Sequence, residues 1–228
     1  EEARFFGGNR GHALTAGELL ARDEESRAIP KKLVRLLGLK PLLKQGLRTL
    51  SNGEFRKILI ARALIRSPRL LILDDPFAGL DADNRELLAV TIADLMNHGT
   101  QLILVTQRVE EVIPGISHVA LIRQGRLALA ARREEVMTPA LMESFLKEGR
   151  PPLGHSLTTA PLPVEKTAVS AAPLVEMRHV AVSYGSAIVF RDLNWTVRQG
   201  EHWAVVGPNG SGKTTLLRLL TGQEAPDA

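Results

Sequence analysis

Cysteine is absent from the 228 residues of the sequence, and aromatic side chains make up only 4% of it. Without cysteine the chain has no disulfide and offers no thiolate as a nucleophile or metal ligand, which fits a reducing cytoplasm. Its six histidines show no ligand spacing, so a metal site built by the protein alone is not expected.

An excess of one charge and long apolar runs are also missing. The 29 basic residues are scattered among 25 acidic ones, and the formal net charge is only +4, so nucleic acid is not expected as a partner. No apolar run approaches the roughly 18 residues that cross a bilayer. The opening residues, "EEARFFGGNRGH", lack a basic region followed by an apolar stretch. Neither a membrane span nor an export signal is therefore expected.

Hydrophobic residues make up 44% of the chain, enough to build the core of one large domain or two smaller ones. Residues 149–173 are rich in Pro, Ala, Ser and Thr and show no apolar period, which is typical of an extended linker. We therefore expect residues 1–148 and 174–228 to be separate regions.

Helical patterns and short apolar runs alternate before this linker. The expected helices start at a capping box of Thr15 and Glu18, at Pro30, at Ser51, at about Ala82 and at Thr138. The continuously apolar runs, residues 70–73 and 101–106, indicate strands buried on both faces of a parallel sheet. The run "HVALIRQGRLALAA" predicts a hairpin that turns at Gln124 and Gly125.

After the linker come three strand-like runs, "LVEMRHVAVSYG", "AIVFRDLNWTVRQG" and "EHWAVVG". They predict an antiparallel layer, followed by a helix over residues 212–220 with Gly222 as its C-cap. Trp195 and Trp203 alternate with polar neighbours and are expected in the core rather than in a binding site.

The stretch "GPNGSGKTT" matches the phosphate-loop pattern G-x-x-x-x-G-K-[ST] between a strand and a helix. Its glycines allow the backbone to approach an anion, and the helix N-terminus supplies a positive dipole end. Lys213 would reach the terminal phosphates and Thr214 a magnesium ion. The predicted nucleotide-binding residues of this loop are Gly207, Pro208, Asn209, Gly210, Ser211, Gly212, Lys213, Thr214 and Thr215.

Two weaker motifs lie far upstream. In "LLILDDP" the carboxylate of Asp74 can hold magnesium while Asp75 polarises an attacking water, although acidic pairs at strand ends also cap helices. The run "LSNGE", residues 50–54, is by itself a capping box at the start of a helix.

Together with "AGLD", these motifs resemble an ATP-binding-cassette (ABC) ATPase. "LSNGE" resembles its signature, "LLILDD" its Walker B strand and "AGLD" its D-loop. The resemblance implies an α/β P-loop NTPase fold: a RecA-like parallel sheet, a helical signature subdomain and an antiparallel β subdomain. ATP and Mg²⁺ are the implied cofactors. The implied site residues are Ser51, Asn52, Gly53 and Glu54 of the signature, Asp81 of the D-loop, and Asp74 with Thr214 around magnesium.

The resemblance also implies partners. Cassettes of this family pair head to tail, so a second cassette of the same parent chain is expected as a partner. A membrane-spanning transporter subunit is expected as well. The protein itself is expected in the cytoplasm, at the inner face of the cell membrane. Tyr184 in "VSYG" matches the aromatic residue that stacks on adenine. Within tandem cassettes, "LNWTV" and the short linker most resemble ATPases associated with molybdenum transport.

The order of the motifs is reversed, because the family runs from phosphate loop to signature to Walker B. Residues 1–148 therefore resemble the back of one cassette and residues 174–228 the front of another, as in an excerpt of a tandem duplication. Alternatively, residues 202–206 fill the missing strand of the first sheet and bring Lys213 near Asp74. In the duplicated protein Lys213 would instead face Ser51.

Several positions depart from the family pattern. Asp75 stands where Glu is usual and Gln107 where His is usual, and both changes are expected to slow hydrolysis. Asn52 and Glu54 replace the usual Gly and Gln of the signature. Two alternatives to a transport ATPase remain: a soluble ABC ATPase acting on nucleic acid or the ribosome, and a chain that binds ATP without turnover.

Overall fold

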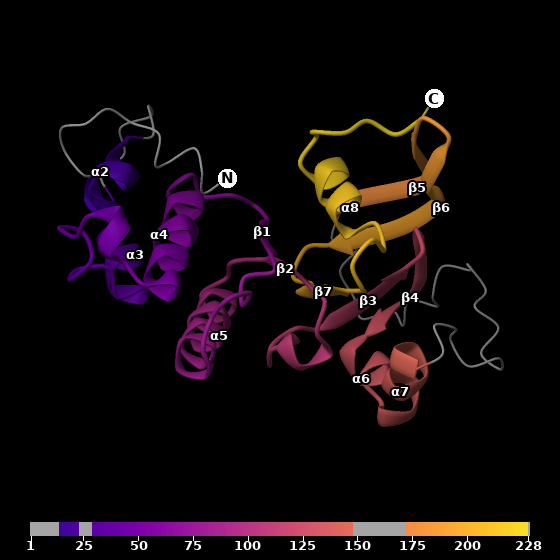
Figure 1. Ribbon diagram of the computed structural model, residues 1–228, viewed down its shortest axis with the longest axis horizontal. Helices are drawn as coiled ribbons and strands as arrows, with labels where there is room; N and C mark the ends of the chain where they lie inside the picture. The colour runs from indigo at the N-terminus through magenta and orange to yellow at the C-terminus, as the bar shows by residue number, and fades with distance from the viewer. Residues whose placement is uncertain (1–13, 23–28, 148–171, 228) are drawn as a thin grey trace. The chain divides into compact units, whose positions relative to one another are not determined.

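The computed structural model describes residues 14–22, 29–147 and 172–227, and these fall into two compact units (Figure 1). One unit takes the described part of residues 1–69 together with 77–95, and the other takes residues 70–76 and the described residues from 96 onward. The predicted linker lies almost wholly outside the described residues. Its last residue, Pro173, begins a strand.

The first unit is helical, as the sequence predicts. Its described helices are α2 (Ala16–Ala21), α3 (Lys31–Leu36), α4 (Asn52–Ile65) and most of α5 (Ala82–Asn97), with a 3-10 turn at Leu47–Thr49. Both predicted capping boxes form, at Thr15 with Glu18 and at Ser51 with Glu54. The residues after Gly38 form turns.

The second unit contains a five-stranded sheet in the order β1-β2-β7-β3-β4. Its strands are β1 (Leu71–Asp74), β2 (Leu102–Thr106), β3 (His118–Arg123), β4 (Arg126–Arg132) and β7 (Trp203–Val206). Four strands run parallel, and β4 joins the edge antiparallel to β3. All residues of β2 and β7 are buried, as expected for central strands covered on both faces.

Strand β7 lies between β2 and β3, although it comes from the far end of the chain (Figure 1). Val205 pairs with Val105 of β2 on one side and with Ala120 of β3 on the other. The prediction that residues 202–206 fill this position in the sheet is confirmed. The prediction that "EHWAVVG" belongs to the antiparallel layer is wrong, because its continuously apolar side chains suit a central parallel strand.

The antiparallel layer consists of β5 (Pro173–Tyr184) and β6 (Ala187–Arg198). Helix α8 (Lys213–Leu220) follows the phosphate loop, and its leucines pack into one core with this pair and with β2, β3 and β7. Trp195 and Trp203 are each 4% exposed and meet edge to face, with ring centroids 5.4 Å apart. Their prediction as core residues is confirmed.

The β3–β4 hairpin turns at Gln124 and Gly125, whose φ angles of 48° and 66° are those of a type I′ turn. Helix α7 (Pro139–Lys147) begins after Thr138 as predicted. The structure also contains a short helix, α6 (Arg133–Val136), and a 3-10 turn at Val109–Glu111. Neither element has a strong sequence signal, and neither is predicted from the sequence.

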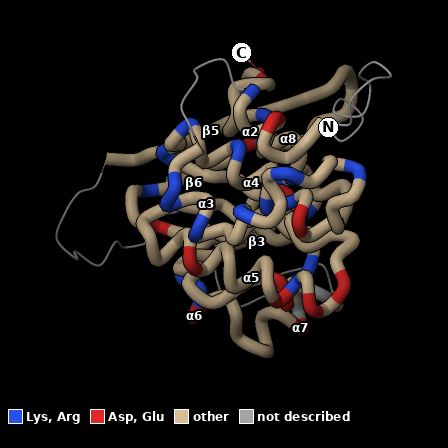
Figure 2. Tube along the Cα trace, turned by 90° about the vertical axis from the view of Figure 1, so that its left-hand side faces the viewer, with Lys and Arg blue, Asp and Glu red and all other residues tan. Residues whose placement is uncertain are grey.

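Basic and acidic residues are interspersed along the tube in Figure 2. No helix in the described ranges combines the length and the apolar character needed to span a bilayer. Within the same ranges, no three His, Asp or Glu side chains group in a way that could hold a metal ion by themselves.

Candidate functional site

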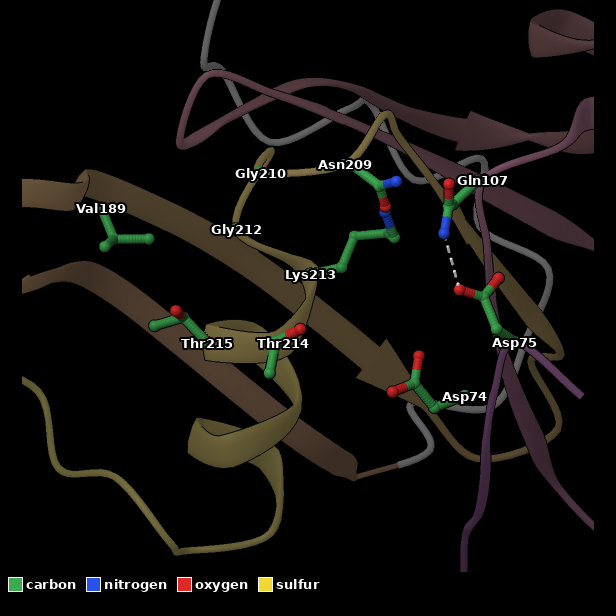
Figure 3. Close-up of a pocket in the computed structure, with 10 residues that line it drawn as sticks. All are labelled: Asp74, Asp75, Gln107, Val189, Asn209, Gly210, Gly212, Lys213, Thr214 and Thr215. Carbon is green, nitrogen blue, oxygen red and sulfur yellow. Dashed lines mark hydrogen bonds between the residues drawn. The ribbon is translucent and has the colours of Figure 1, made fainter. Parts of the chain in front are cut away.

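Three parallel strands of the second unit end at one edge of the sheet, where ligands of open α/β sheets bind. Asp74 is the last residue of β1, Gln107 directly follows β2 and Gly207 directly follows β7. A pocket of about 270 Å³ opens at this edge (Figure 3). The residues that line it are Asp74, Asp75, Gln107, Val189, Asn209, Gly210, Gly212, Lys213, Thr214 and Thr215. The structure thus brings the acidic residues after β1 together with the phosphate-loop motif.

The loop between β7 and α8 is held close to its neighbours. Gly212 precedes the helix with a φ of 107°, and a Cβ atom there would lie 2.9 Å from Cζ of Phe190. A Cβ on Gly207 would overlap the carbonyl oxygen of Ile122. Ser211 between them is 2% exposed. The loop therefore tolerates only glycine at these two positions, as a cradle that lets the backbone approach an anion requires.

Lys213 opens α8 and is only 8% exposed. Its Nζ donates hydrogen bonds to the carbonyl oxygens of Gly207 at 2.7 Å and of Pro208 at 3.0 Å. Figure 3 shows the side chain extending from the helix start toward the side of the pocket that carries Asp75 and Gln107. The Lys213 ammonium is thus bonded to backbone carbonyls of the phosphate loop.

The charges of the pocket influence one another. Burial lowers the pKa of Lys213, and the nearby Asp75 and Asp74 carboxylates partly offset this. Burial also raises the pKa of Asp74, the Asp75 carboxylate raises it further, and the Lys213 ammonium opposes both. The Lys213 ammonium thus faces the carboxylates of Asp74 and Asp75. A phosphate group that binds together with a divalent cation would change the net charge of this pocket only slightly.

Asp75 adopts a left-handed backbone with a φ of 40°, a conformation that Asp tolerates better than most residues. Its N–H donates to the Val105 carbonyl at 2.8 Å. Nε2 of Gln107 donates to Oδ2 of Asp75 at 3.0 Å. The two residues whose departures from the family pattern are expected to slow hydrolysis are therefore bonded to each other.

Buried hydrogen bonds hold the segment that carries Gln107. Thr106 is fully buried and donates its hydroxyl hydrogen to the carboxylate of Glu111, which is 8% exposed. The same hydroxyl accepts a hydrogen bond from the N–H of Arg108 at 3.1 Å. These contacts close the turn around Gln107, and Glu111 is a site-supporting residue that the sequence analysis does not single out.

Tyr184 lies at the end of β5 and is 42% exposed. Its hydroxyl donates to the Glu224 carboxylate at 2.7 Å, and the neighbouring Ser183 donates to Asp227 at 2.7 Å. Tyr184 is not among the described residues that line the pocket. Its stacking role remains a prediction.

The predicted signature and D-loop residues belong to the helical unit. Ser51 caps α4, where Oγ accepts from the N–H of Glu54 at 3.3 Å. Asp81 caps α5 by accepting from the N–H of Asn84 at 2.8 Å and from its side-chain amide at 3.0 Å. These two bonds, the backbone one first, lower the pKa of Asp81.

Gly53 of the predicted signature lies close to the cap of α5. A Cβ atom on Gly53 would lie 2.8 Å from Oδ1 of Asn84, so the start of α4 approaches α5 within the helical unit. Asn52, the first residue of α4, is exposed. The predicted signature and D-loop thus adjoin each other.

Two residues at or beside the phosphate pocket are not predicted as site residues by the sequence. Val189 of β6 lines it, and Gly125 of the β3–β4 turn donates its N–H to the carbonyl oxygen of Ser211 at 3.0 Å. The alternating pattern of β6 predicts Val189 only as a strand residue. The turn glycine is predictable from "QG", but its contact with the loop is not.

Comparison with known proteins shows which family the chain resembles. The family model for ABC transporters matches residues 8–78 and 190–228. The ABC transporter ATP-binding protein ModF of Escherichia coli (strain K12) is 37% identical over 216 residues, which cover 91% of this chain and 42% of ModF. An ABC transporter ATP-binding protein of Schizosaccharomyces pombe is 35% identical over 182 residues, or 79% of this chain and 35% of that protein.

A solved ABC transporter in an inward-facing conformation superposes with a TM-score of 0.50 at 20% identity, covering 61% of this chain and 60% of that one. At this identity the likeness shows the fold alone. The chain spans less than half the length of the two sequence relatives. The family match and these relatives support an ABC transporter ATP-binding domain in this chain.

Proposed function

We propose that the chain is part of the ATP-binding and ATP-hydrolysing component of an ABC transporter. The observation that carries this proposal is the pocket in which Lys213, at the start of α8, meets Asp74 and Asp75 at the end of β1. Segments far apart in the sequence there combine a glycine-rich anion cradle, a buried ammonium and two carboxylates.

The phosphates of ATP bind to the backbone of residues 207–212 and to Lys213, which exchanges its bonds to the loop carbonyls for bonds to phosphate oxygens. Magnesium prefers oxygen ligands, and the Thr214 hydroxyl and Asp74 carboxylate line the same pocket, so these residues fit the ion. Bound there, the ion would neutralise phosphate charge. Tyr184 completes the proposed site by stacking on the adenine ring.

Hydrolysis at this site is proposed to be slow. Asp75 takes the place of a longer glutamate, and its carboxylate already accepts a hydrogen bond from Gln107. Gln107 in turn donates a neutral hydrogen bond where a protonated histidine would bring a positive charge. This part of the proposal includes the limiting case of a site that binds ATP without turnover.

The motif order supports a proposal about the parent protein. In a duplicated parent, residues 1–148 would belong to one cassette and residues 174–228 to the next, with a linker between them, and Lys213 would face Ser51. The pocket that joins Lys213 with Asp74 is the site proposed for this chain by itself. The similarity to ModF supports the duplicated parent, because it extends over 91% of this chain and therefore includes both regions. In the pair of cassettes, the signature residues Ser51–Glu54 and the D-loop Asp81 would face a nucleotide of the other cassette.

The finer proposal is transport of a molybdenum-related substrate, with a membrane-spanning subunit as partner and the cassette on the cytoplasmic face of the membrane. It is supported by the resemblance of "LNWTV" and the short linker to ATPases associated with molybdenum transport. Uptake of molybdate by cells that lack the intact protein, compared with wild-type cells, tests this part separately.

Calorimetry with ATP and Mg²⁺ tests the binding proposal. Lys213→Ala should weaken ATP binding by at least about tenfold, since a hydrogen bond to a charged group contributes about 1.5–3 kcal/mol. Lys40→Ala removes an exposed lysine of the helical unit and is the matched control. Equal affinity of the native chain and Lys213→Ala would contradict the proposed site.

A further inference from the structure

The turn between β3 and β4 contacts the phosphate loop, although no motif links them. The N–H of Gly125 donates a 3.0 Å hydrogen bond to the carbonyl oxygen of Ser211. Ser211 lies between two glycines of the loop with φ angles of 74° and 107°, Gly210 and Gly212. This carbonyl therefore lies between two glycines with left-handed backbones, and the turn holds it from outside.

The hydrogen bond orients more than one atom. A trans peptide is planar, and its C=O and N–H point in opposite directions. Because Gly125 holds the carbonyl of Ser211, it also sets the direction of the Gly212 N–H, which belongs to the same peptide. Gly212 lines the pocket and immediately precedes α8. The Gly212 amide is thus a donor whose direction is decided by the hairpin.

The β3–β4 turn packs tightly against β6. A Cβ atom on Gly125 would overlap the carbonyl oxygen of Val189, and the Val189 side chain lines the same pocket. At the other end of the loop, Gly207 packs on the carbonyl of Ile122 in β3. The loop is therefore supported at both ends by the β3–β4 hairpin.

We propose that the β3–β4 turn, Gln124–Gly125, is a positioning element of the phosphate site, which aims the Gly212 amide at a bound phosphate. This inference rests on the proposed function, because it concerns how the same pocket binds the phosphates of ATP. Gly125 does not touch the nucleotide, and it acts through Ser211.

The test is a pair of matched substitutions in the full chain, Gly125→Ala and Gly185→Ala. Both glycines have φ angles near +60° in hairpin turns of the second unit, 66° and 60°, so both substitutions strain the backbone similarly. Only at Gly125 does the added methyl meet another residue, because the space around Gly185 is open.

Gly125→Ala should weaken binding of ATP with Mg²⁺, and of inorganic pyrophosphate, by about tenfold or more, the loss expected for one hydrogen bond to a charged group. Gly185→Ala should bind both as the native chain does. Pyrophosphate reports the phosphate site alone, so a parallel loss for both ligands separates positioning from a defect elsewhere. Equal affinities of the two variants would overturn the inference and leave the proposed function standing.

Amide hydrogen exchange of the native chain decides the case in which Gly125→Ala does not fold. ATP binding should slow exchange of the Gly125 amide about tenfold or more, because the loop that accepts its hydrogen bond becomes ordered. The Gly185 amide should be unaffected. Unchanged exchange at Gly125 with ATP bound would overturn the inference, and failure of the native chain to bind ATP would overturn the proposed function as well.

Discussion

The Gln107 side chain donates a hydrogen bond of 3.0 Å to the carboxylate of Asp75, joining the residues that follow β2 and β1. Both residues differ from the Glu and His of the family pattern. In the proposed hydrolytic site, the Asp75 carboxylate therefore starts from a short side chain and already accepts one hydrogen bond, which leaves fewer lone pairs to orient a water molecule.

Asp75→Glu should speed hydrolysis. The added methylene extends the carboxylate toward the pocket, and because misplacement by about 1 Å can cost about a hundredfold, a gain of about tenfold or more is expected. Single-turnover assays with ATP and Mg²⁺ measure it. Asp75→Asn keeps the length without the charge and should not be faster than the native chain. Equal rates for the native chain and Asp75→Glu would show that reach does not limit turnover.

The buried pair of Thr106 and Glu111 should be strongly coupled. Thr106→Val leaves the 8% exposed Glu111 carboxylate without its hydroxyl donor, which should cost about 1–3 kcal/mol of unfolding free energy. The double variant Thr106→Val with Glu111→Leu removes both polar groups and should lose less than the sum of the single variants. Denaturant unfolding of all four proteins measures this cycle. Additive losses would mean that the two side chains do not depend on each other.

Asp74 should make the fold less stable at neutral pH. Burial, followed by the Asp75 carboxylate, raises its pKa against the opposing Lys213. A carboxyl group with a raised folded-state pKa contributes stability while protonated, and that contribution is lost as pH rises through the folded-state pKa. Asp74→Asn should therefore raise the melting temperature at pH 7 without nucleotide, and the difference should shrink in acid. A lower melting temperature for Asp74→Asn at pH 7 would contradict this account.

The cap at Ser51 should stabilise the helical unit independently of any nucleotide. Ser51→Ala removes the acceptor for the Glu54 N–H and should cost about 0.5–2 kcal/mol, whereas Ser51→Gly should cost only a few tenths. Chemical denaturation without ATP separates this structural role from the proposed signature role. If Ser51→Ala is as stable as the native chain, the capping box contributes nothing measurable.

Local features of this fold are predictable from the sequence. The capping boxes at Thr15 and Ser51, the turn at Gln124–Gly125 and the apolar strand over residues 101–106 depend on neighbouring residues, so their patterns are sufficient. The placement of β7 is predictable only in part. Its apolar run matches a central strand that the first region lacks, but its position among the strand-like runs after the linker also predicts, wrongly, that it belongs to the antiparallel layer.

Contacts between distant segments are not predictable in the same way. Nothing local to Gly125 indicates Ser211 as its partner, and nothing in "RVEEV" indicates that Glu111 is the buried acid bonded to Thr106. The hydroxyl of Tyr184 bonds to Glu224, a contact that follows from how the chain after α8 returns to β5. Each of these contacts depends on tertiary packing, and the spacing of residues in a single sequence does not indicate which distant segments pack together.

The central claim is that Lys213 and Asp74 serve one nucleotide–magnesium site. Titration of ATP with and without Mg²⁺ into the native chain, Asp74→Asn and Lys213→Ala tests it most directly. We expect Mg²⁺ to tighten ATP binding by the native chain, Asp74→Asn to abolish that gain while retaining metal-free binding, and Lys213→Ala to weaken binding in both conditions. An undiminished Mg²⁺ gain in Asp74→Asn would contradict the account, because Asp74 would then belong to a different site from Lys213.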